Sequence, residues 1–405
     1  MKARLLSGFA VLSALLGILF SCSANGGSIY ATIEAEKKTA VSLLPQNITI
    51  IDLVKTGGPL PYFVAAGAVY NGSLPDAVDV VGWPVQNQAP IAIVPPASGA
   101  LCEALVAFGA VPPLPLFGGF YTSNGSIMGL YKSATSPYSF QGASAIGSPG
   151  PFTGKQITFL QTTSGAPPYL FAVAATASPA GYTYELYYST DGSIFLLATG
   201  MTGLAKPITG VAYFNNNYFV TCGGTLYVTT TPNDINTLSS IGSIDFNTVA
   251  GSTDDLRGVT ADGTYILIPA KSGNVYYSTD GISTWGSVPT NDQVNQAVVG
   301  FLNVSAQVGL KPALTLPVTP NPVYTYLVGS DGLGYYYLTL TLGGTPTLTR
   351  YSDVTVTGLY AGSVRRILVD LPNGNTVLMG NNATGLWRAT FNSTTGAVSS
   401  SWVHE

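Results

Sequence analysis

The stretch ITGVAYFNNNYFVTCGGTLYVTT, residues 208–230, decides the fold of this chain. In it, three short runs of β-branched and aromatic residues are separated by two turns, Asn215-Asn216-Asn217 and Gly223-Gly224. Such runs are typical of strands, and Asn and Gly accept the backbone angles of tight hairpin turns. A fourth run follows after a polar turn. The predicted antiparallel strands are Ile208–Phe214, Tyr218–Thr221, Thr225–Thr230 and Leu238–Ile241.

The same order of strands and turns recurs along the chain. In the next copy, Gly258–Thr260 and Thr264–Pro269 flank the turn Asp262-Gly263, and Val275-Tyr276-Tyr277 follows. A looser first copy covers Tyr62–Tyr70. An aromatic residue marks the third predicted strand of the later copies, at Tyr131, Tyr187, Tyr227, Tyr276, Tyr335 and Trp387. Four-stranded units repeated about every 50 residues are the sequence signature of a β-propeller.

A propeller also suits the energetics of the repeat. One four-stranded sheet buries too little apolar surface to be stable alone, whereas sheets stacked around an axis bury both faces and protect their edges. We therefore predict an all-β fold, a β-propeller of four-stranded antiparallel blades. Roughly 360 residues at about 50 per blade give seven blades, with six or eight as alternatives. Two β-sandwiches or a β-helix are the other architectures, but sandwiches lack a fixed repeat of this kind.

The N-terminal residues indicate where the protein is located. Lys2 and Arg4 precede the apolar run Leu5–Phe20, and small residues follow. A basic start, a short apolar core and a small residue at the cut are typical of a secretory signal peptide. The run is short for a spanning helix, which needs roughly 20 apolar residues. Plain secretion and a membrane-spanning anchor are the alternatives to the interpretation that follows.

The sequence Leu19-Phe20-Ser21-Cys22 resembles the lipobox of bacterial lipoproteins, although Phe20 departs from the small or β-branched residue usual there. The resemblance implies that Cys22 is lipidated, with palmitate among the expected acyl chains, and that the lipid anchors the chain in a membrane. The expected location is the cell envelope. Because the non-acidic Ser23 follows the cysteine, the outer membrane or cell surface is favoured over the inner membrane. We expect a signal peptide at 1–21, the lipidated cysteine with a flexible tether at 22–42, and the propeller at 43–405.

Composition excludes several classes of function. Only 8% of the 405 residues are charged, and the net charge of −4 would become about −6 on loss of Lys2 and Arg4. The sequence has no basic patch, so no nucleic-acid partner is expected on electrostatic grounds. One histidine, His404, leaves no Ser-His-Asp triad and no Cys–His metal site, so neither metal nor cofactor is expected. Cys102 and Cys222 remain either as buried thiols or as a disulfide.

Residues 278–285, STDGISTW, resemble an Asp-box, the S-x-D-x-G-x-T-W hairpin of sialidase-type (BNR) repeat propellers, with Ile282 in place of the pattern's Gly. A second copy begins at Ser189 and has Phe195 near the Trp position. The resemblance implies a structural turn in which Asp binds backbone amides and the aromatic packs into the sheet. An ordinary Asp-Gly hairpin is the alternative. The expected box residues are Ser278, Asp280, Thr284, Trp285, Ser189 and Asp191.

Catalysis of the sialidase type is not expected. Its arginine triad and first-blade Arg-Ile-Pro motif have no counterpart, because no arginine lies between Arg4 and Arg257. The chain is therefore expected not to be an enzyme. A glycan-active envelope enzyme, a glycoside hydrolase or lyase using loop carboxylates such as Asp254 and Asp255, is the alternative.

Binding residues are sought in the loops. The loop Ser243–Arg257 is the longest polar one and concentrates charge, although a plain solvated loop has the same composition. We expect a binding or scaffold module for a protein or glycan partner, with a scaffold subunit of an envelope assembly machine as a related hypothesis. The candidate binding residues are Asp254, Asp255, Arg257, Lys271 and Asp331.

Overall fold

The protein is described here from a computed structural model. The described residues are 48–57, 62–72, 91–135, 137–146, 150–163, 165, 167–240, 255–271, 273–289, 304–306, 323–330, 334–341, 343–350, 364–370, 375–382, 384–392, 398 and 402–404. The signal peptide, Cys22 and the tether lie outside these residues, as do Asp254 and Asp331. Within the described ranges, no helix is long and apolar enough to cross a membrane.

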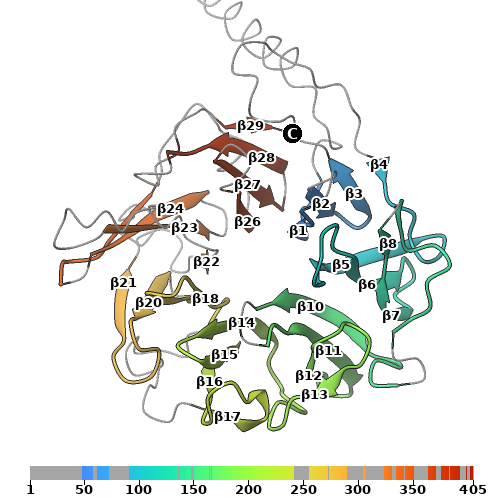
Figure 1. Cartoon of the computed structure of the whole chain (residues 1–405), viewed down its shortest axis with the longest axis horizontal. Helices are drawn as coiled ribbons and strands as arrows, with labels where there is room; N and C mark the ends of the chain where they lie inside the picture. Colours follow the sequence, from blue (N-terminus) through green and yellow to red (C-terminus); the bar gives the residue numbers. More distant parts are fainter. Residues whose placement is uncertain are drawn as a thin grey trace, which may run out of the picture. The chain divides into compact units, whose positions relative to one another are not determined.

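Seven antiparallel blades form a ring (Figure 1), as the repeat predicts. Blade 1 consists of β1 (Asp52–Lys55), β2 (Tyr62–Ala65), β3 (Val69–Gly72) and β4 (Ile91–Ala92). Blade 2 has β5 (Ala100–Ala107), β6 (Leu116–Thr122) and β7 (Ile127–Lys132), with the small hairpin β8 (Ala134–Thr135) and β9 (Tyr138–Ser139) after them. Ile146 donates its amide to the carbonyl of Leu130 in β7 at 2.7 Å, so the chain returns alongside this third strand.

The remaining blades each have four strands in sequence order. Blade 3 contains β10 (Gln156–Thr162), β11 (Leu170–Ser178), β12 (Gly181–Ser189) and β13 (Leu196–Leu197), and blade 4 contains β14 (Ile208–Phe214), β15 (Asn217–Cys222), β16 (Thr225–Thr229) and β17 (Leu238–Ser240). Blade 5 contains β18 (Thr260–Ala261), β19 (Ile266–Pro269), β20 (Asn274–Ser278) and β21 (Gly286–Pro289). Blade 6 contains β22 (Val304–Ala306), β23 (Val323–Ser330), β24 (Tyr335–Thr341) and β25 (Thr347–Arg350), and blade 7 contains β26 (Val364–Asp370), β27 (Thr376–Asn381), β28 (Gly385–Thr390) and β29 (Val403–His404).

The strands predicted from residues 208–241 are confirmed to within a residue or two. One difference concerns the first turn, where Phe214 pairs with Asn217, so that only Asn215 and Asn216 form the loop. Both have positive φ, 47° and 65°, as a two-residue hairpin turn requires. The aromatics predicted on third strands lie there in blades 2 to 7, on β7, β12, β16, β20, β24 and β28.

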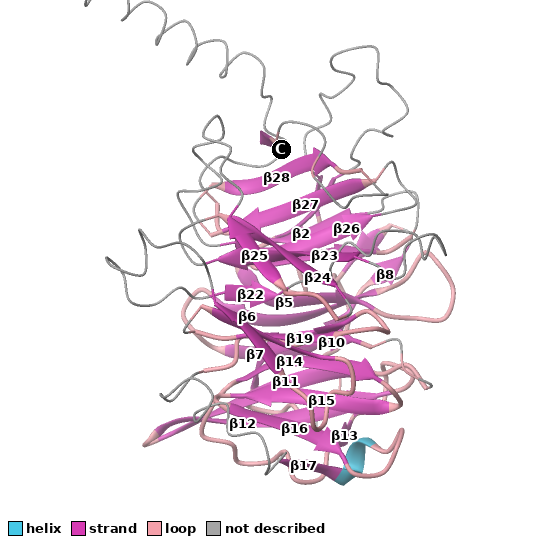
Figure 2. Ribbon diagram, turned by 90° about the vertical axis from the view of Figure 1, so that its left-hand side faces the viewer, coloured by secondary structure: helices cyan, strands magenta, loops and turns pink. Residues whose placement is uncertain are grey.

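The hydrophobic core is divided among the blade interfaces. Each of seven buried clusters joins two neighbouring blades. Between blades 2 and 3, for example, Phe117 of β6 packs with Leu160 of β10 and Leu170 of β11. Seen from the side, the strands of successive blades lie in layers, with loops at both rims (Figure 2). Because the apolar surface is shared between sheets, no blade has a complete core of its own.

A backbone hydrogen bond, apolar packing and two ion pairs close the ring between blade 7 and blade 1. Among the described strands, blade 1 contains only N-terminal segments and blade 7 only C-terminal ones. The amide of Ile50 donates to the carbonyl of Asn381 at 3.0 Å, and Ile50 packs against Leu378. Two ion pairs join β1 to β26: Arg366 Nε lies 2.8 Å from Asp52, and Lys55 Nζ lies 2.5 Å from Asp370.

Both described cysteines are buried free thiols, so the disulfide alternative is wrong. Burial raises the pKa of Cys222 to about 11, and it raises the pKa of Cys102 still further above its ordinary value. Neither thiol is therefore ionised at neutral pH, which makes both poor nucleophiles.

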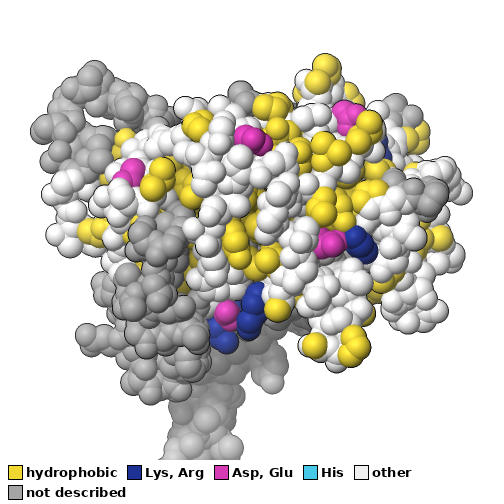
Figure 3. Space-filling model, turned by 90° about the horizontal axis from the view of Figure 1, so that it is seen from below, with side chains coloured by type: hydrophobic (Ala, Val, Ile, Leu, Met, Phe, Trp, Pro, Cys, Tyr) yellow, Lys and Arg dark blue, Asp and Glu magenta, His cyan; other side chains and the backbone are white. Residues whose placement is uncertain are grey.

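Charged side chains are sparse on the outer side of the ring that includes the fourth strands of blades 3 and 4 (Figure 3). Ile194, Leu196 and Leu197 are exposed at the outer edge of blade 3. Hydrophobic side chains in yellow, and uncharged side chains and backbone in white, make up most of the described surface in this view, as the low charge content of the sequence predicts.

Candidate functional site

The first strands of six blades surround a cavity of about 320 Å³ in the middle of the ring. Its walls come from β1, β5, β10, β14, β26 and the segment that leads into β18 (Figure 1). The first strand of each blade lies nearest the axis, so its inward side chains have no neighbouring strand on that side. The cavity is therefore the place where the fold presents side chains from many blades to one ligand.

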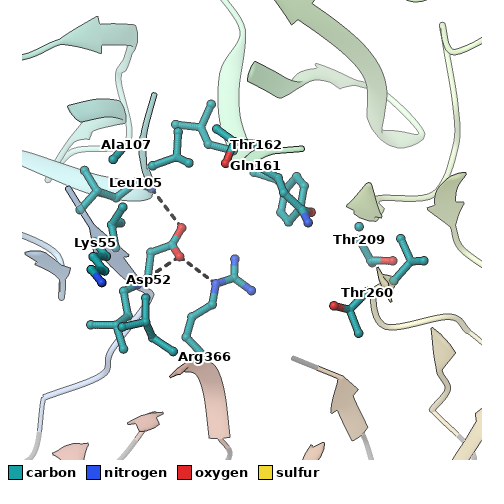
Figure 4. A pocket seen from close by; sticks show the side chains of 18 of the residues that line it. Asp52, Lys55, Leu105, Ala107, Gln161, Thr162, Thr209, Thr260 and Arg366 are labelled. Carbon is teal, nitrogen blue, oxygen red and sulfur yellow. Dashed lines mark hydrogen bonds and ion pairs between the residues drawn. The ribbon is translucent and has the colours of Figure 1, made fainter. Parts of the chain in front are cut away.

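Asp52 anchors one wall of the cavity. Its side chain accepts hydrogen bonds from Arg366 Nε at 2.8 Å and from the amides of Leu105 and Leu53, both at 3.1 Å (Figure 4). These partners lie on blades 7, 2 and 1. The residue is only 5% exposed, so the carboxylate is desolvated and depends on these donors. Its role in the wall is structural.

Arg366 lies between Asp52 and the open part of the cavity. Its guanidinium carbon is 5.9 Å from the centre of the Phe159 ring, which supports it by a cation–π contact. In Figure 4 the end of the side chain points toward the middle of the cavity, on the side facing Gln161. Arg366 Nε thus joins blade 7 to blade 1 through Asp52, while the other guanidinium nitrogens face the space that a ligand would occupy.

The opposite wall offers uncommitted hydrogen-bonding groups (Figure 4). The side-chain oxygen of Gln161 accepts from the amide of Val211 at 3.0 Å, which fixes the orientation of the side-chain amide. Its NH₂ group remains available to a ligand. The hydroxyls of Thr162 and Thr260 make no hydrogen bond with other described residues.

Arg257 is the lining residue whose charge lacks compensation. The side-chain Nε is buried and has no hydrogen-bond partner, and the guanidinium forms no ion pair within the described chain. The backbone is held in place, because the amide of Arg257 donates to the carbonyl of Pro269 at 2.8 Å and that of Leu256 donates to Gly223 at 2.7 Å. A buried unpaired donor costs free energy unless a ligand satisfies it.

The charges that line the cavity are mainly positive. Among the described residues, Lys55, Arg257 and Arg366 line it together with one carboxylate, Asp52, although the chain as a whole has a net charge of −4. Asp52 neutralises Arg366, and Asp370 outside the lining neutralises Lys55. One positive charge, on Arg257, is left over. The arrangement can bind a group that accepts hydrogen bonds and carries negative charge.

The predicted binding residues differ in whether they line the cavity. Arg257 lines the cavity. Asp255 and Lys271 are adjacent, since the amide of Lys271 donates to the carbonyl of Asp255 at 2.8 Å, but neither residue lines the cavity. Asp254 and Asp331 lie outside the described residues, so their predicted role stays a prediction.

Sequence reasoning missed most of the lining. Thr260 ends a predicted strand, while Asp52, Gln161 and Arg366 lie on β1, β10 and β26, for which the sequence predicts no strand bounds; the predicted binding residues all lie in loops. The signal that could have found them is a charged or amide residue on the first strand of a repeat. In a propeller that strand faces the axis, so its polar residues are candidates for an axial site.

The residues of the two Asp-Gly turns make matching hydrogen bonds. Asp280 Oδ1 accepts from the amides of Ile282, Ser283 and Thr284 at 2.9, 3.1 and 3.2 Å. Asp191 Oδ1 accepts from Ser193 and Ile194 at 2.7 and 3.0 Å. In each turn the preceding Ser, Ser278 or Ser189, donates to the Asp and accepts from the Gly amide; the aromatic that follows is half-buried in one turn and buried in the other, at Trp285 and Phe195.

These hydrogen bonds lower the pKa of both carboxyl groups. Partial burial alone would raise the pKa of Asp280, but hydrogen bonds from Ser283, from backbone amides and from Ser278 outweigh it and hold the pKa well below its ordinary value. Backbone amides of Ile194 and Ser193 lower the pKa of Asp191. Both carboxylates are thus ionised acceptors committed to their turns, and neither lines the cavity.

Each turn also packs against the preceding blade. A Cβ added to Gly192 would lie 2.4 Å from Cζ of Phe117, and one added to Gly281 would lie 2.6 Å from Cζ of Phe219. The two phenylalanines occupy the second strands of blades 2 and 4, and both are fully buried. The turns therefore fix the contact between neighbouring blades as well as the hairpin.

Among the described residues, no group of three His, Cys, Asp or Glu side chains is arranged to hold a metal ion. The groups that could hold a ligand are instead the guanidinium, hydroxyl and amide groups of the cavity.

No protein-family model matches the sequence, and the comparison with curated proteins found no match. Among solved structures, the WD40 β-propeller domain of Doa1 is similar with a TM-score of 0.50 and 10% identity, over 88% of this chain and 97% of that one. The chain is a β-propeller.

Two further solved structures share the fold. YCF48 bound to a D1 peptide has a TM-score of 0.50 and 15% identity, over 86% of this propeller and 95% of that chain. PorZ, a surface component of the type-IX secretion system of Porphyromonas gingivalis, has a TM-score of 0.51 and 12% identity, over 89% of this propeller. The propeller spans only 39% of PorZ and 39% of the similar extracellular domain of a putative one-component system from B. thetaiotaomicron. At such identities the likeness establishes the fold.

Proposed function

We propose that this propeller is a non-enzymatic binding module, anchored by lipid in a cell envelope, which holds a protein or glycan partner. The observation that carries the proposal is the axial cavity, whose walls present unpaired donors from several blades. A propeller in PorZ belongs to a surface component, and another occurs in an extracellular domain, which is compatible with this location. YCF48 was solved with a peptide, so a related fold does bind such a partner.

The proposed anchor rests on the sequence around Cys22, which lies outside the described residues. Each buried lipid methylene contributes about 0.8 kcal/mol, and stable attachment takes two acyl chains. A diacylglyceryl-modified and N-acylated cysteine exceeds that requirement. We further propose that residues 189–195 and 278–285 are Asp-box hairpins, a resemblance supported by their shared pattern of Ser and Asp hydrogen bonds.

Replacement of Cys22 tests the anchor. We expect Cys22→Ala to abolish incorporation of a clickable palmitate in cells and to leave either an unprocessed precursor or a soluble product. Cys222→Ala is the matched control, because that buried thiol should not affect labelling. A wild-type protein that takes up no label would show that the lipobox interpretation is wrong.

The alternative function, a glycoside hydrolase or lyase, needs acid–base groups that face the substrate. Most glycosidases use two carboxyl groups on either side of the scissile bond. Among the described residues that line the cavity, Asp52 is the one carboxylate, and three hydrogen bonds already engage it. The cavity therefore favours binding over hydrolysis.

Filling the cavity tests the binding function. We expect the full-length protein in detergent to bind some member of a panel of envelope glycan fragments and peptides, measured by calorimetry, and to release it unchanged by mass spectrometry. Thr260→Trp should place an indole in the cavity and weaken that binding at least about tenfold. Thr162→Trp on the neighbouring wall is a second variant in case the first folds poorly.

Thr202→Trp is the matched control, since Thr202 is exposed and does not line the cavity. Binding that survives both cavity variants would place the site elsewhere and contradict the proposal. Turnover of any panel member by the wild-type protein would favour the enzyme instead.

A further inference from the structure

We propose that Arg257 holds a carboxylate, so that the ligand of the axial cavity is an organic acid group with one negative charge, flanked by hydroxyl or amide groups. The inference rests on the proposed binding function of the same cavity and gives its ligand a chemical class. It follows from the state of one side chain, from the charges around it, and from the size of the space.

Arg257 is positioned but unsatisfied. Its Nε is buried without a hydrogen-bond partner in the described structure, while backbone bonds to Pro269 and Gly223 hold the segment that carries it. Arginine presents several N–H donors in one plane, a geometry that matches the two oxygens of a carboxylate. Nothing in the described protein supplies such an acceptor, because Asp52 is engaged by Arg366 and by two amides.

The balance of charge selects a monoanion. Two of the three cations on the walls, Lys55 and Arg366, are paired with Asp370 and Asp52. A ligand therefore meets one uncompensated positive charge, on Arg257. A phosphate dianion carries two negative charges, one more than Arg257 can neutralise. A carboxylate carries one negative charge and neutralises Arg257.

The other hydrogen-bonding groups of the cavity indicate which groups the ligand carries beside its carboxylate. The NH₂ group of Gln161 and the hydroxyls of Thr162 and Thr260 are available on the walls around the cavity. A volume of about 320 Å³ is at the lower end for small-molecule sites, enough for one sugar ring or the end of a peptide. Acidic sugars and peptide C-termini both combine a carboxylate with neighbouring hydrogen-bonding groups, and experiment separates these two sources.

The test compares acids with matched neutral molecules on the full-length protein in detergent. One arm uses D-glucuronate against D-glucose, and the other uses N-acetyl-Ala-Ala against its C-terminal amide, with inorganic phosphate as a third probe. In one arm at least, we expect the acid to bind about tenfold or more tightly than its neutral partner. Arg257→Gln should reduce this preference to about twofold or less, and Arg257→Lys should retain part of it.

Arg365→Gln is the matched control, because Arg365 is exposed on β26 beside Arg366 but does not line the cavity. Its preference for acids should equal that of the wild type, and thermal unfolding should show that all variants are folded. Whichever arm responds identifies the source of the carboxylate.

Several results would overturn the inference. Equal binding of acid and neutral molecules to the wild type would do so while leaving the binding function intact, and so would a preference that persists in Arg257→Gln. Phosphate that binds more tightly than either acid would replace the carboxylate by a different class of anion. If no probe binds while Thr260→Trp still abolishes panel binding, the cavity is a site but not for such acids; if Thr260→Trp has no effect either, the binding function itself fails.

Discussion

Asp52→Ala is expected to lower the free energy of unfolding by about 3–5 kcal/mol, the cost of removing one member of a buried ion pair. The side chain joins three blades, through Arg366 on blade 7, Leu105 on blade 2 and its own strand in blade 1. Its loss leaves the Arg366 guanidinium and the Leu105 amide without their acceptor. The Lys55–Asp370 ion pair and the apolar cluster of Ile50 and Leu378 also join blades 7 and 1, but neither offers an acceptor to these two donors.

The measurement is chemical denaturation of the full-length protein, with Arg366→Met and the double variant completing a cycle. If the pair acts as a unit, the double variant should be less destabilised than the sum of the single changes. Glu185→Gln is the control, because the Lys155–Glu185 ion pair lies within blade 3 and its side chains are 22% and 23% exposed. We expect its effect to be about 1 kcal/mol or less. Equal effects of Asp52→Ala and Glu185→Gln would show that the ion pair does not close the ring.

Gly281→Ala is expected to lower the free energy of unfolding by about 2–5 kcal/mol. The residue has a φ of +74°, and a side chain adds roughly 1–2 kcal/mol in that left-handed region. Its Cβ would also lie 2.6 Å from the ring of Phe219, a fully buried residue of the preceding blade that has little room to move. Overpacking of this kind costs about 1–3 kcal/mol.

Gly263→Ala separates the two contributions. Gly263 lies in the same blade at a φ of +92°, but a Cβ there has no atom within 4 Å. We expect Gly263→Ala to lower the free energy of unfolding only by the conformational contribution of about 1–2 kcal/mol. The same chemical denaturation measures it. Phe219→Leu should lessen the additional cost of Gly281→Ala if the ring is what the new methyl meets. Equal effects at Gly263 and Gly281 would show that the turn does not press on blade 4.

The sequence predicts the blades well because the signals for their strands and turns come from residues that are close together in the chain. Within one blade, residues 208–240 carry strand composition, alternation and turn residues, and the hairpins join neighbours in the chain. The repeat then gives the ring, since aromatic residues such as Tyr187 and Tyr276 recur on the third strand of each copy. The two Asp-Gly turns were likewise predictable, because Ser, Asp and Gly bond within a few residues of one another.

The candidate site was predicted only in part. Arg257 was singled out as a charged residue in a polar loop, and the structure places it on the cavity wall. Its loop neighbour Asp255 does not line the cavity, because the chain turns away there toward Lys271. Composition identified the charge but had no means of showing which residues of the loop face the axis.

The sequence by itself determined the strand order, the turn chemistry and the propeller architecture, because each depends on interactions between residues close in the chain. Only the tertiary structure decided the site. Asp52 and Arg366 are 314 positions apart, and closure of the ring brings them together. Closure also gathers Gln161 of blade 3 and Arg257 and Thr260 of blade 5 around one space. Which groups remain unpaired there depends on the packing of all the first strands at once, and no local pattern contains that information.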